Sequence, residues 1–422
     1  MNTKTVEKRR MSGATALTLL CWLVYATSYI GKLSYSANIP SILLAFEVSR
    51  ADAGLVSTFF FFAYGIGQVV NGICCKHYPL KYVLFASLLV GSGMNLLVGL
   101  VPSFAAFKFF WLLNGAAMSF LWTGLIRLLS ETLHKRDIGR AVLLMGTTVA
   151  TGTFIVYGMS SLFTALGVFR LTFYIAAGLL LIAATVWFLL FDRLVLPLRR
   201  EREAEREEAV IESPSDGEGT GRKPRIGRDL GLLFAILALF AVINNFVKDG
   251  LTTWTPKILS DLYKTPEWLS ILLTLLLAVM AIGGAMVAMK TQKRTHDFVG
   301  TCTVFYAVSA ILIAAVILLL GTPLIPVTIA SFAIVSCLMA GVNNVITSMM
   351  PLRLKDRVNS GRMAGLLNSF CYLGSTVTSY GLGAIADGFG WSAVFYVLLA
   401  AAALAAVIGI LYLILCKNRI TE

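Results

Sequence analysis

Lys32-Leu-Ser-Tyr-Ser-Ala-Asn-Ile-Pro-Ser-Ile-Leu43 and Lys248-Asp-Gly-Leu-Thr-Thr-Trp-Thr-Pro-Lys-Ile-Leu259 share the pattern K-x7-P-x-I-L, and their lysines stand 216 positions apart. Each stretch lies within a long apolar segment. A lysine at the centre of a membrane helix costs roughly 2.5 to 3.5 kcal/mol on insertion scales. The presence of this charge at the same point in each half indicates that the charge has a function. Two facing lysines would bind an anion.

The composition is that of an integral membrane protein. Of the 422 residues, 58% are hydrophobic and 14% are charged, whereas soluble domains contain about 25% charged residues. Long apolar runs without alternation predict membrane-spanning helices and not the strands of a barrel. We expect an all-α membrane protein with twelve spans, at about 14–45, 51–75, 82–101, 104–131, 139–165, 168–192, 229–262, 267–289, 297–321, 323–352, 361–386 and 391–416.

The basic residues predict the orientation. If the N-terminus is inside, 28 of the 35 lysines and arginines fall in inner segments and five in outer ones, and the remaining two are Lys32 and Lys248. An excess of positive charge marks the cytoplasmic side. We therefore expect a multi-pass protein of a cell membrane, the bacterial cytoplasmic membrane, with both termini in the cytoplasm. The net charge of +13 reflects this topology, so the bilayer is an expected partner and nucleic acid is not.

A polar segment divides the chain. Residues 199–208 are highly charged and can form a helix, and residues 213–221 are rich in Ser, Gly and Pro, as in a flexible linker. We expect an N-terminal six-helix bundle over residues 1–192, a cytoplasmic linker over 193–228 and a C-terminal six-helix bundle over 229–422.

The two halves are also related in sequence. At an offset of 222, Gly152 corresponds to Gly374, and Gly139-Arg140 and Phe173-Tyr-Ile correspond to Gly361-Arg362 and Phe395-Tyr-Val. Together with the repeated lysine pattern, these matches relate helices at both ends of each half. Related halves around a midplane site are typical of secondary transporters, so we expect two pseudo-symmetric bundles.

Motifs of catalysis are absent. The chain has no H-E-x-x-H, no G-x-x-x-x-G-K-[ST] and no G-x-S-x-G, and its three histidines fall in expected loops. We expect neither an enzyme nor a metal or cofactor site. Uphill transport would have to use an ion or counter-substrate gradient.

The environment of the lysines predicts a binding site. Both lie near mid-span by the rise per residue of a helix. Tyr25, Tyr29 and Tyr35 stand at −7, −3 and +3 from Lys32, and Asn244 and Asn245 at −4 and −3 from Lys248. Phenol and amide groups on one helical face can bind a ligand's oxygens while ammonium groups neutralise its charge.

Two alternatives remain for these lysines. They could pair with carboxylates: Asp249 adjoins Lys248, although neighbours on a helix point about 100° apart, and no clearly buried carboxylate is evident for Lys32. One of them could also lie in water outside the membrane.

Further residues suggest moving parts. Arg127, Glu131 and Arg140 stand at the inner ends of the fourth and fifth spans, where they could form a salt-bridge latch at an inner gate; charge is also common there because the loop is cytoplasmic. The Trp254-Thr-Pro256 sequence is expected to kink or break the seventh span, and Trp254 could alternatively anchor at the interface.

The chain resembles the major facilitator superfamily, and within it the organophosphate/phosphate antiporter family of glycerol-3-phosphate and hexose-phosphate transporters. The likeness runs over nearly the whole chain. It rests on Tyr25-x3-Tyr-x2-Lys32, Tyr64-Gly-Ile-Gly-Gln68, Trp122-x4-Arg127, Lys248 with Trp254-Thr-Pro256, Gly361-x3-Gly-Leu-Leu-Asn-x3-Tyr-Leu-Gly374 and Ala386-Asp-Gly-Phe-Gly-Trp391.

The resemblance implies two bundles around a central cavity that opens alternately to each side. It implies that Lys32 and Lys248 contact a substrate phosphate and that aromatic residues line the cavity, namely Tyr25, Tyr29, Tyr64, Tyr372 and Trp122. We add Gln68 and Asn245 as candidate substrate contacts. The chain departs from the expected pattern at three places. Its basic positions hold lysine where the family usually has arginine, and Val149 stands where the glycerol-3-phosphate carriers have a substrate-contacting histidine. The superfamily's motif between the second and third spans is degenerate.

We therefore expect a secondary transporter of a small organic anion, by preference a phosphate ester exchanged for inorganic phosphate, acting as a monomer with a counter-anion. A carboxylate or other organic anion moved by a proton-linked or uniport mechanism is an alternative. A transporter-like receptor that binds such an anion and signals is another. A proton-linked exporter of hydrophobic compounds, independent of both lysines, is the third.

Overall fold

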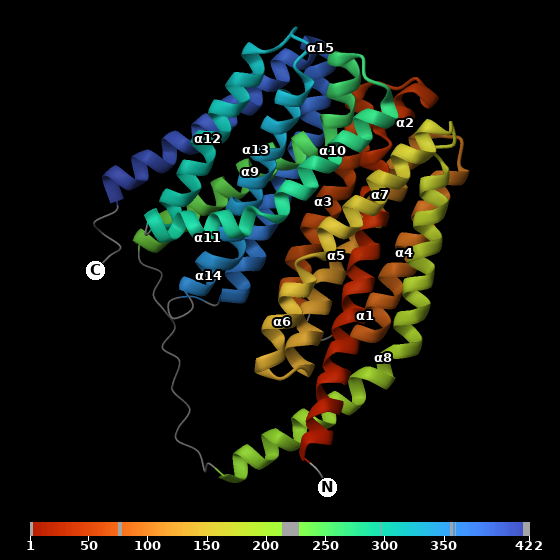
Figure 1. Ribbon diagram of the computed structural model, residues 1–422, viewed down its shortest axis with the longest axis vertical. Coiled ribbons are helices and arrows are strands. Elements are labelled where there is room, and N and C mark those ends of the chain that lie inside the picture. Colours follow the sequence, from red (N-terminus) through yellow and green to blue (C-terminus); the bar gives the residue numbers. More distant parts are fainter. Residues whose placement is uncertain are drawn as a thin grey trace.

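The computed structural model describes residues 3–74, 78–212, 228–295, 297–354, 358 and 360–416, and these are helical almost throughout (Figure 1). The N-terminal half contains α1 (Thr3–Ala37), α2 (Ile39–Phe46), α3 (Arg50–Cys74), α4 (Leu80–Leu100), the 3-10 turn η2 (Phe104–Ala106), α5 (Phe107–Thr132), α6 (Lys135–Met145), α7 (Thr148–Ala165) and α8 (Leu171–Glu212). The C-terminal half contains α9 (Arg228–Tyr263), α10 (Glu267–Ile282), α11 (Gly284–Thr295), α12 (Phe298–Leu318), α13 (Ile325–Asn344), the π-helical turn η3 (Val345–Met349), α14 (Met350–Arg353) and α15 (Ser360–Cys416).

These elements make twelve spans among the described residues. Ten helices are long and apolar enough to cross a membrane, and the bent pair α10 and α11 adds an eleventh. Gly390 has φ 77° and ψ 175°, a backbone conformation that ends one helix and starts another within α15. This break divides α15 into two spans, so the predicted all-α fold of two six-helix bundles is confirmed.

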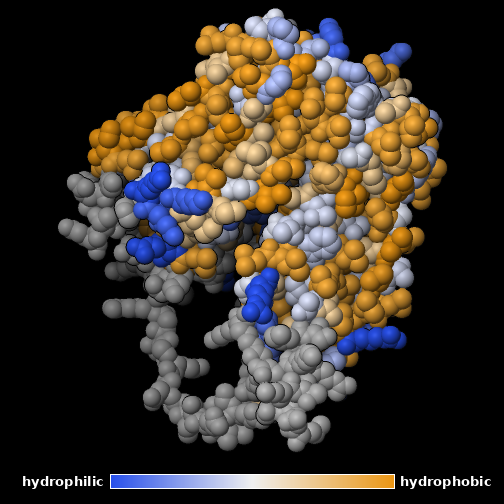
Figure 2. Space-filling view, in the orientation of Figure 1, coloured by the Kyte–Doolittle hydropathy of each residue, from blue (hydrophilic) through white to orange (hydrophobic). Residues whose placement is uncertain are grey.

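The outer surface of the bundles is apolar because it faces lipid. Large side chains such as Phe109, Leu143 and Leu318 are mostly exposed, and apolar residues cover most of the face in Figure 2. A soluble protein would bury such residues. Here the backbone polar groups are satisfied inside helices, and the side chains meet hydrocarbon.

The predicted linker begins as a helix. α8 continues the sixth span through the charged stretch to Glu212, in agreement with the expected charged helix. The stretch 213–221 lies outside the described residues.

The repeated proline has different effects in the two halves. In the first span, α1 ends at Ala37 and α2 begins at Ile39, so the helix is interrupted just before Pro40. In the seventh span, α9 continues without a break past Pro256, and the expected break is absent. Proline removes the N–H that would bond to Thr252, four residues earlier. The hydroxyl of Tyr157 on α7 donates to that carbonyl instead, at 3.3 Å.

The internal repeat is visible in a helix crossing that occurs once in each half. A Cβ added to Gly152 of α7 would lie 2.4 Å from the carbonyl oxygen of Ala26 on α1, and one added to Gly374 of α15 would lie 2.0 Å from that of Val242 on α9. Ala26 and Val242 each stand six residues before a lysine. Both glycines therefore allow a close backbone approach that places Lys32 and Lys248 at equivalent points.

The halves meet at one end of the molecule. We use "outer end" for the end where α1 stops and α3 begins, and "inner end" for the opposite one, following the predicted orientation. At the outer end α3 packs along α15 and α7 along α10. At the inner end α11 and α14 stand apart from α6 (Figure 1), and Figure 2 shows a hollow between the halves there.

Candidate functional site

Lys32 lies on α1 among aromatic rings. Its ammonium nitrogen is 4.5 Å from the ring centre of Tyr29 and 4.2 Å from that of Tyr64 on α3, and the residue is only 6% exposed. No carboxylate lies within ion-pair distance of it in the part of the chain that the structure describes. Cation–π contacts stabilise this charge only partly, so Lys32 is a buried cation available to an anion.

The predicted aromatic residues surround this lysine. The ring centres of Tyr25 and Trp122 are 4.8 Å apart, those of Tyr25 and Tyr29 are 5.4 Å apart, and those of Tyr64 and Tyr372 are 4.5 Å apart. Tyr372 comes from α15, so residues of both halves meet here. Four of the sequence-predicted tyrosines and Trp122 thus form one cluster. Tyr35 has other partners, because its hydroxyl donates to the Ala53 carbonyl at 2.9 Å and its ring packs against Trp111.

Lys248 has a different environment on α9. Its ammonium nitrogen lies 3.4 Å from Oδ1 of Asp249, and the two side chains are 26% and 17% exposed. The pairing that helical geometry argues against does occur, because the long lysine side chain reaches its neighbour's carboxylate. Lys248 remains within electrostatic range of Lys32, and its partial exposure in mid-helix indicates open space beside it.

A polar network fixes Asp249. Its Oδ2 accepts hydrogen bonds from Nδ2 of Asn245, at 3.1 Å, and from the Ser375 hydroxyl of α15. The same amide nitrogen is 3.0 Å from the Ser375 oxygen, and the Asn244 amide donates to Oδ1 of Asn245. Asn245 is therefore beside the lysine as predicted, but its amide is engaged in holding Asp249.

Gln68 links the halves one helical turn from Tyr64 toward the inner end of α3. Its Nε2 donates to the carbonyl of Ser119 at 2.9 Å, and its Oε1 is 3.5 Å from Nδ2 of Asn368 on α15. The side chain is buried. The same Oε1 also accepts from the Thr123 hydroxyl at 3.5 Å, so both ends of the Gln68 amide already contact protein groups.

The proposed gating residues occupy the inner end. Nε of Arg127 lies 2.6 Å from Oε1 of Glu131, and Arg199 of α8 approaches Oε2 of the same carboxylate at 3.5 Å. These ion pairs lie within the N-terminal half. The predicted salt-bridge latch at an inner gate is not tested by them and stays a prediction.

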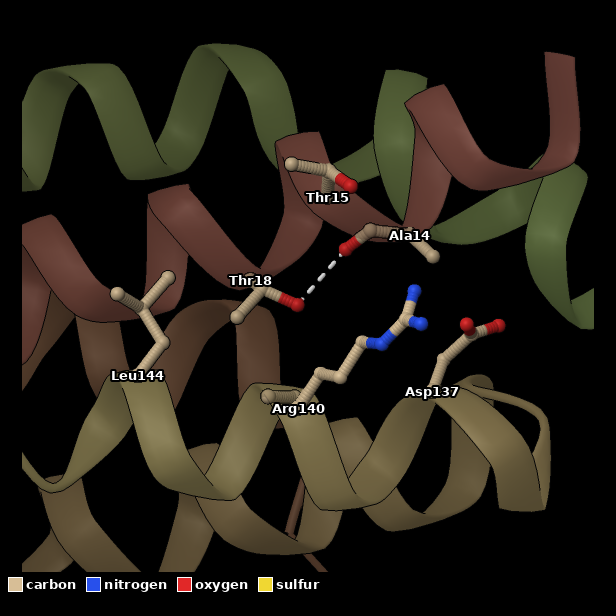
Figure 3. A pocket seen from close by; sticks show the side chains of 7 residues that line it. Ala14, Thr15, Thr18, Asp137, Arg140 and Leu144 are labelled. Carbon is tan, nitrogen blue, oxygen red and sulfur yellow. Dashed lines mark hydrogen bonds between the residues drawn. The ribbon is translucent and has the colours of Figure 1, made fainter. Parts of the chain in front are cut away.

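Arg140 lies apart from that pair, in a small cavity between α1 and α6. The cavity has a volume of about 130 Å³, and Ala14, Thr18, Asp137 and Leu144 line it. Figure 3 shows the Arg140 guanidinium between Ala14 and Asp137. Pockets for small molecules measure roughly 300 Å³ or more, so this cavity is too small for a sugar phosphate.

Sequence reasoning missed part of the network. Asn245 and Asp249 are four residues apart, the spacing of one helical face, and this signal could have grouped them. Ser375, 126 positions from Asp249, has no such signal. Trp254, considered as an interface anchor, is fully buried and lies 5.9 Å from Trp391 between ring centres.

Two related bundles with a charged cluster between them define a polytopic helical membrane protein. The sequence model described as Major Facilitator Superfamily matches residues 21–377. The chain belongs to the major facilitator superfamily.

Relatives and solved structures agree with this assignment. The chain is 23% identical to the membrane sensor protein UhpC of Escherichia coli (strain K12) over 400 residues, 92% of this chain and 90% of the relative. It is 22% identical to a probable hexose phosphate transport protein of Chlamydia pneumoniae over 412 residues, 90% and 87% of the two chains.

Two solved structures share the fold. The inward-facing, occupied structure of a bacterial homologue of the human lysosomal transporter Spinster has a TM-score of 0.70 at 14% identity, covering 96% of this chain and 97% of that one. The nucleoside transporter NupG has a TM-score of 0.70 at 13% identity, covering 94% and 98%.

Proposed function

We propose that the protein is a secondary transporter of small organic anions, by preference sugar phosphates or other phosphate esters, which it exchanges for inorganic phosphate by alternating access. The observation that carries this proposal is the buried ammonium of Lys32, which has no carboxylate partner among the described residues and lies within electrostatic range of Lys248. An anion between the two lysines would supply the missing charge.

The aromatic cluster would hold the rest of the substrate. Tyr25, Tyr29, Tyr64 and Tyr372 offer hydroxyl groups near Lys32, and Trp122 offers an apolar face suited to a sugar ring. Phosphate is a strong acceptor that lysine binds as a point charge. The resemblance to relatives named hexose phosphate transport proteins supports the same substrate class.

Exchange would follow from the charge of the empty site. Moving unpaired positive charge through a closed, low-dielectric gate is costly, so the site would change sides readily only with an anion bound. The proposed orientation places both termini in the cytoplasm of a bacterial cell, with residues 193–228 as the linker between the halves and with a monomer as the working unit.

Counterflow in proteoliposomes tests the transport proposal. The purified protein should exchange labelled phosphate for sugar phosphates more strongly than for mono- or dicarboxylates. Lys32→Ala and Lys248→Ala should each lower exchange at least about tenfold, because a hydrogen bond to a charged group contributes roughly 1.5 to 3 kcal/mol. Full activity in either variant would exclude the two-lysine site.

A sensor is the second candidate, because two relatives of nearly full length are named membrane sensor proteins. In that case the protein would bind the same anion without moving it. Saturable binding to the purified protein, with lysine dependence but no counterflow in liposomes, would favour the sensor. Counterflow would favour the transporter.

A further inference from the structure

We propose that Asp249 determines the charge of the anion that the site accepts: its carboxylate cancels one of the two lysine charges, so the site discriminates against a doubly charged head group relative to a singly charged one of the same shape. This inference rests on the proposed function, since it concerns the same two lysines. It narrows the substrate by charge, to the singly charged form of a phosphate ester or phosphate.

The geometry holds the carboxylate in the site. Oδ1 faces the Lys248 ammonium at 3.4 Å, and Oδ2 accepts from the Asn245 amide at 3.1 Å and from the Ser375 hydroxyl. All three partners are donors, which match an ionised, acceptor-only carboxylate. Asp249 is thus fixed by groups from both α9 and α15.

The charges of the site then sum to a single positive one. Lys32 and Lys248 contribute two ammonium groups, Asp249 contributes one carboxylate, and Lys32 is within electrostatic range of both other groups. Charges in a buried or half-buried site interact more strongly than in bulk water. A monoanion balances the site, whereas a dianion leaves excess negative charge beside Asp249.

A purely structural role for Asp249 predicts something different. If the carboxylate only ties α9 to α15 through Ser375, then its loss should weaken the binding of every anion alike. A change in the ratio of affinities for two ligands that differ only in charge separates these roles.

Glucose 6-sulfate and glucose 6-phosphate provide such a pair. At about pH 8 the sulfate ester carries one negative charge and the phosphate ester carries two, because a phosphate monoester releases its second proton near pH 6. Their dissociation constants can be measured by thermal stabilisation of the purified full-length protein, which also reports whether a variant is folded. Asp249→Asn should shift the affinity ratio toward the phosphate by at least about tenfold, which corresponds to about 1.4 kcal/mol.

Matched variants make the comparison specific. Asp192→Asn removes a carboxylate that pairs with Lys81 far from the site, and it should leave the ratio unchanged. Asp249→Glu keeps the charge and should retain the parent's ratio. If Asp249→Asn does not fold, then Asp249→Glu and Asp249→Gln give the same comparison, because they differ from each other only in charge.

The outcomes distinguish the two proposals. If binding depends on the lysines but Asp249→Asn leaves the affinity ratio unchanged, by weakening both ligands equally or neither, then this inference alone is overturned. If the parent binds neither ester, or if the lysine variants bind as well as the parent, then the proposed function and this inference both fail.

Discussion

The two lysines that share one sequence pattern differ in how their charge is stabilised. Lys32 is 6% exposed and has aromatic rings around its ammonium, whereas Lys248 is partly exposed and pairs with Asp249. A buried charge without a counter-charge costs free energy that cation–π contacts only partly offset. Lys32 thus destabilises the ligand-free protein, and an anion would relieve this cost.

Neutral substitutions should therefore have opposite effects on stability. Without ligand, Lys32→Met should raise the melting temperature, because it removes a buried charge. Lys248→Met should lower it, because it leaves the Asp249 carboxylate without its cation. Each effect should be roughly 1 kcal/mol, the low end for a buried polar group that loses or lacks its partner. Thermal unfolding in detergent measures both, and equal signs would contradict the difference between the lysines.

The repeated pattern singles out the two lysines, and helical spacing places Tyr25 and Tyr29 on the face of Lys32. The other aromatic residues of the candidate site were expected only from the resemblance to the family, and their contact with a substrate stays a prediction. The structure brings Tyr25, Tyr29, Tyr64 and Tyr372 together as expected. The role of Asp249 could not be predicted in the same way. It depends on the conformation of a flexible lysine side chain and on Ser375, which only the packing of α9 against α15 places there.

At the scale of elements, the repeated glycine crossing sets the height of both lysines. Gly152 and Gly374 each face a backbone carbonyl six residues before a lysine. A carbonyl on a helix cannot move aside as a flexible side chain can. A methyl group at either glycine would therefore push a whole helix away.

Gly152→Ala and Gly374→Ala should each lower both stability and substrate affinity, since the added Cβ would approach a carbonyl oxygen to within 2.4 Å and 2.0 Å respectively. The expected destabilisation is about 1 to 3 kcal/mol, the usual effect of overpacking. Gly158→Ala on α7 and Gly381→Ala on α15 are matched controls, because a Cβ there meets no atom within 4 Å. Melting temperatures and ligand affinities measure the effect, and parity with the controls would show that the crossing is not tight.

Pro256 gives α9 a carbonyl that its own helix cannot satisfy. The fully buried Tyr157 donates to this Thr252 oxygen from the other half of the molecule. Neighbouring helices commonly satisfy backbone groups that a proline frees in membrane helices. The Tyr157 hydroxyl therefore connects α7 to α9 at the carbonyl that the proline leaves without a helical partner.

A double-mutant cycle tests this connection. Tyr157→Phe should destabilise the protein by roughly 1 to 3 kcal/mol, because it leaves a buried acceptor unpaired. In a Pro256→Ala background the alanine N–H can bond to Thr252, so the same substitution should cost much less. Melting temperatures of the four proteins give the coupling. Strict additivity would mean that the Tyr157 hydroxyl has another role.

At the scale of the whole molecule, the fold was predictable because hydropathy, charge asymmetry and internal repetition all act over long stretches. The twelve spans and the two related halves follow from these. The contacts that close the outer end were not predictable, since they join residues such as Arg50 and Asp387, which are 337 positions apart. Which state of the two bundles is populated depends on a few such contacts and leaves no pattern in the sequence.

An ion network joins the halves at the outer end. Arg50, at the start of α3, lies 2.6 Å from Asp261 of α9 and 3.1 Å from Asp387 of α15. Asp387 also accepts the backbone N–H of Ala51 at 2.8 Å, which caps α3 across the interface. Asp261 further accepts from Lys257 and from the indole of Trp391, both at 2.9 Å. The single guanidinium of Arg50 thus connects two helices of the opposite half.

Asp261→Asn should therefore favour opening of the outer end, because it removes the charge that Arg50 and Lys257 share. Ser379 is a suitable probe, since it is fully buried where α15 crosses Gly54 of α3. With Ser379→Cys as the sole cysteine, a charged maleimide should react about tenfold faster for each 1.4 kcal/mol by which closure is weakened. Asp52→Asn is the matched control, because Asp52 pairs at 3.8 Å with Lys108 of its own half. Equal labelling rates in the two variants would show that the Arg50 network does not stabilise the closed outer end.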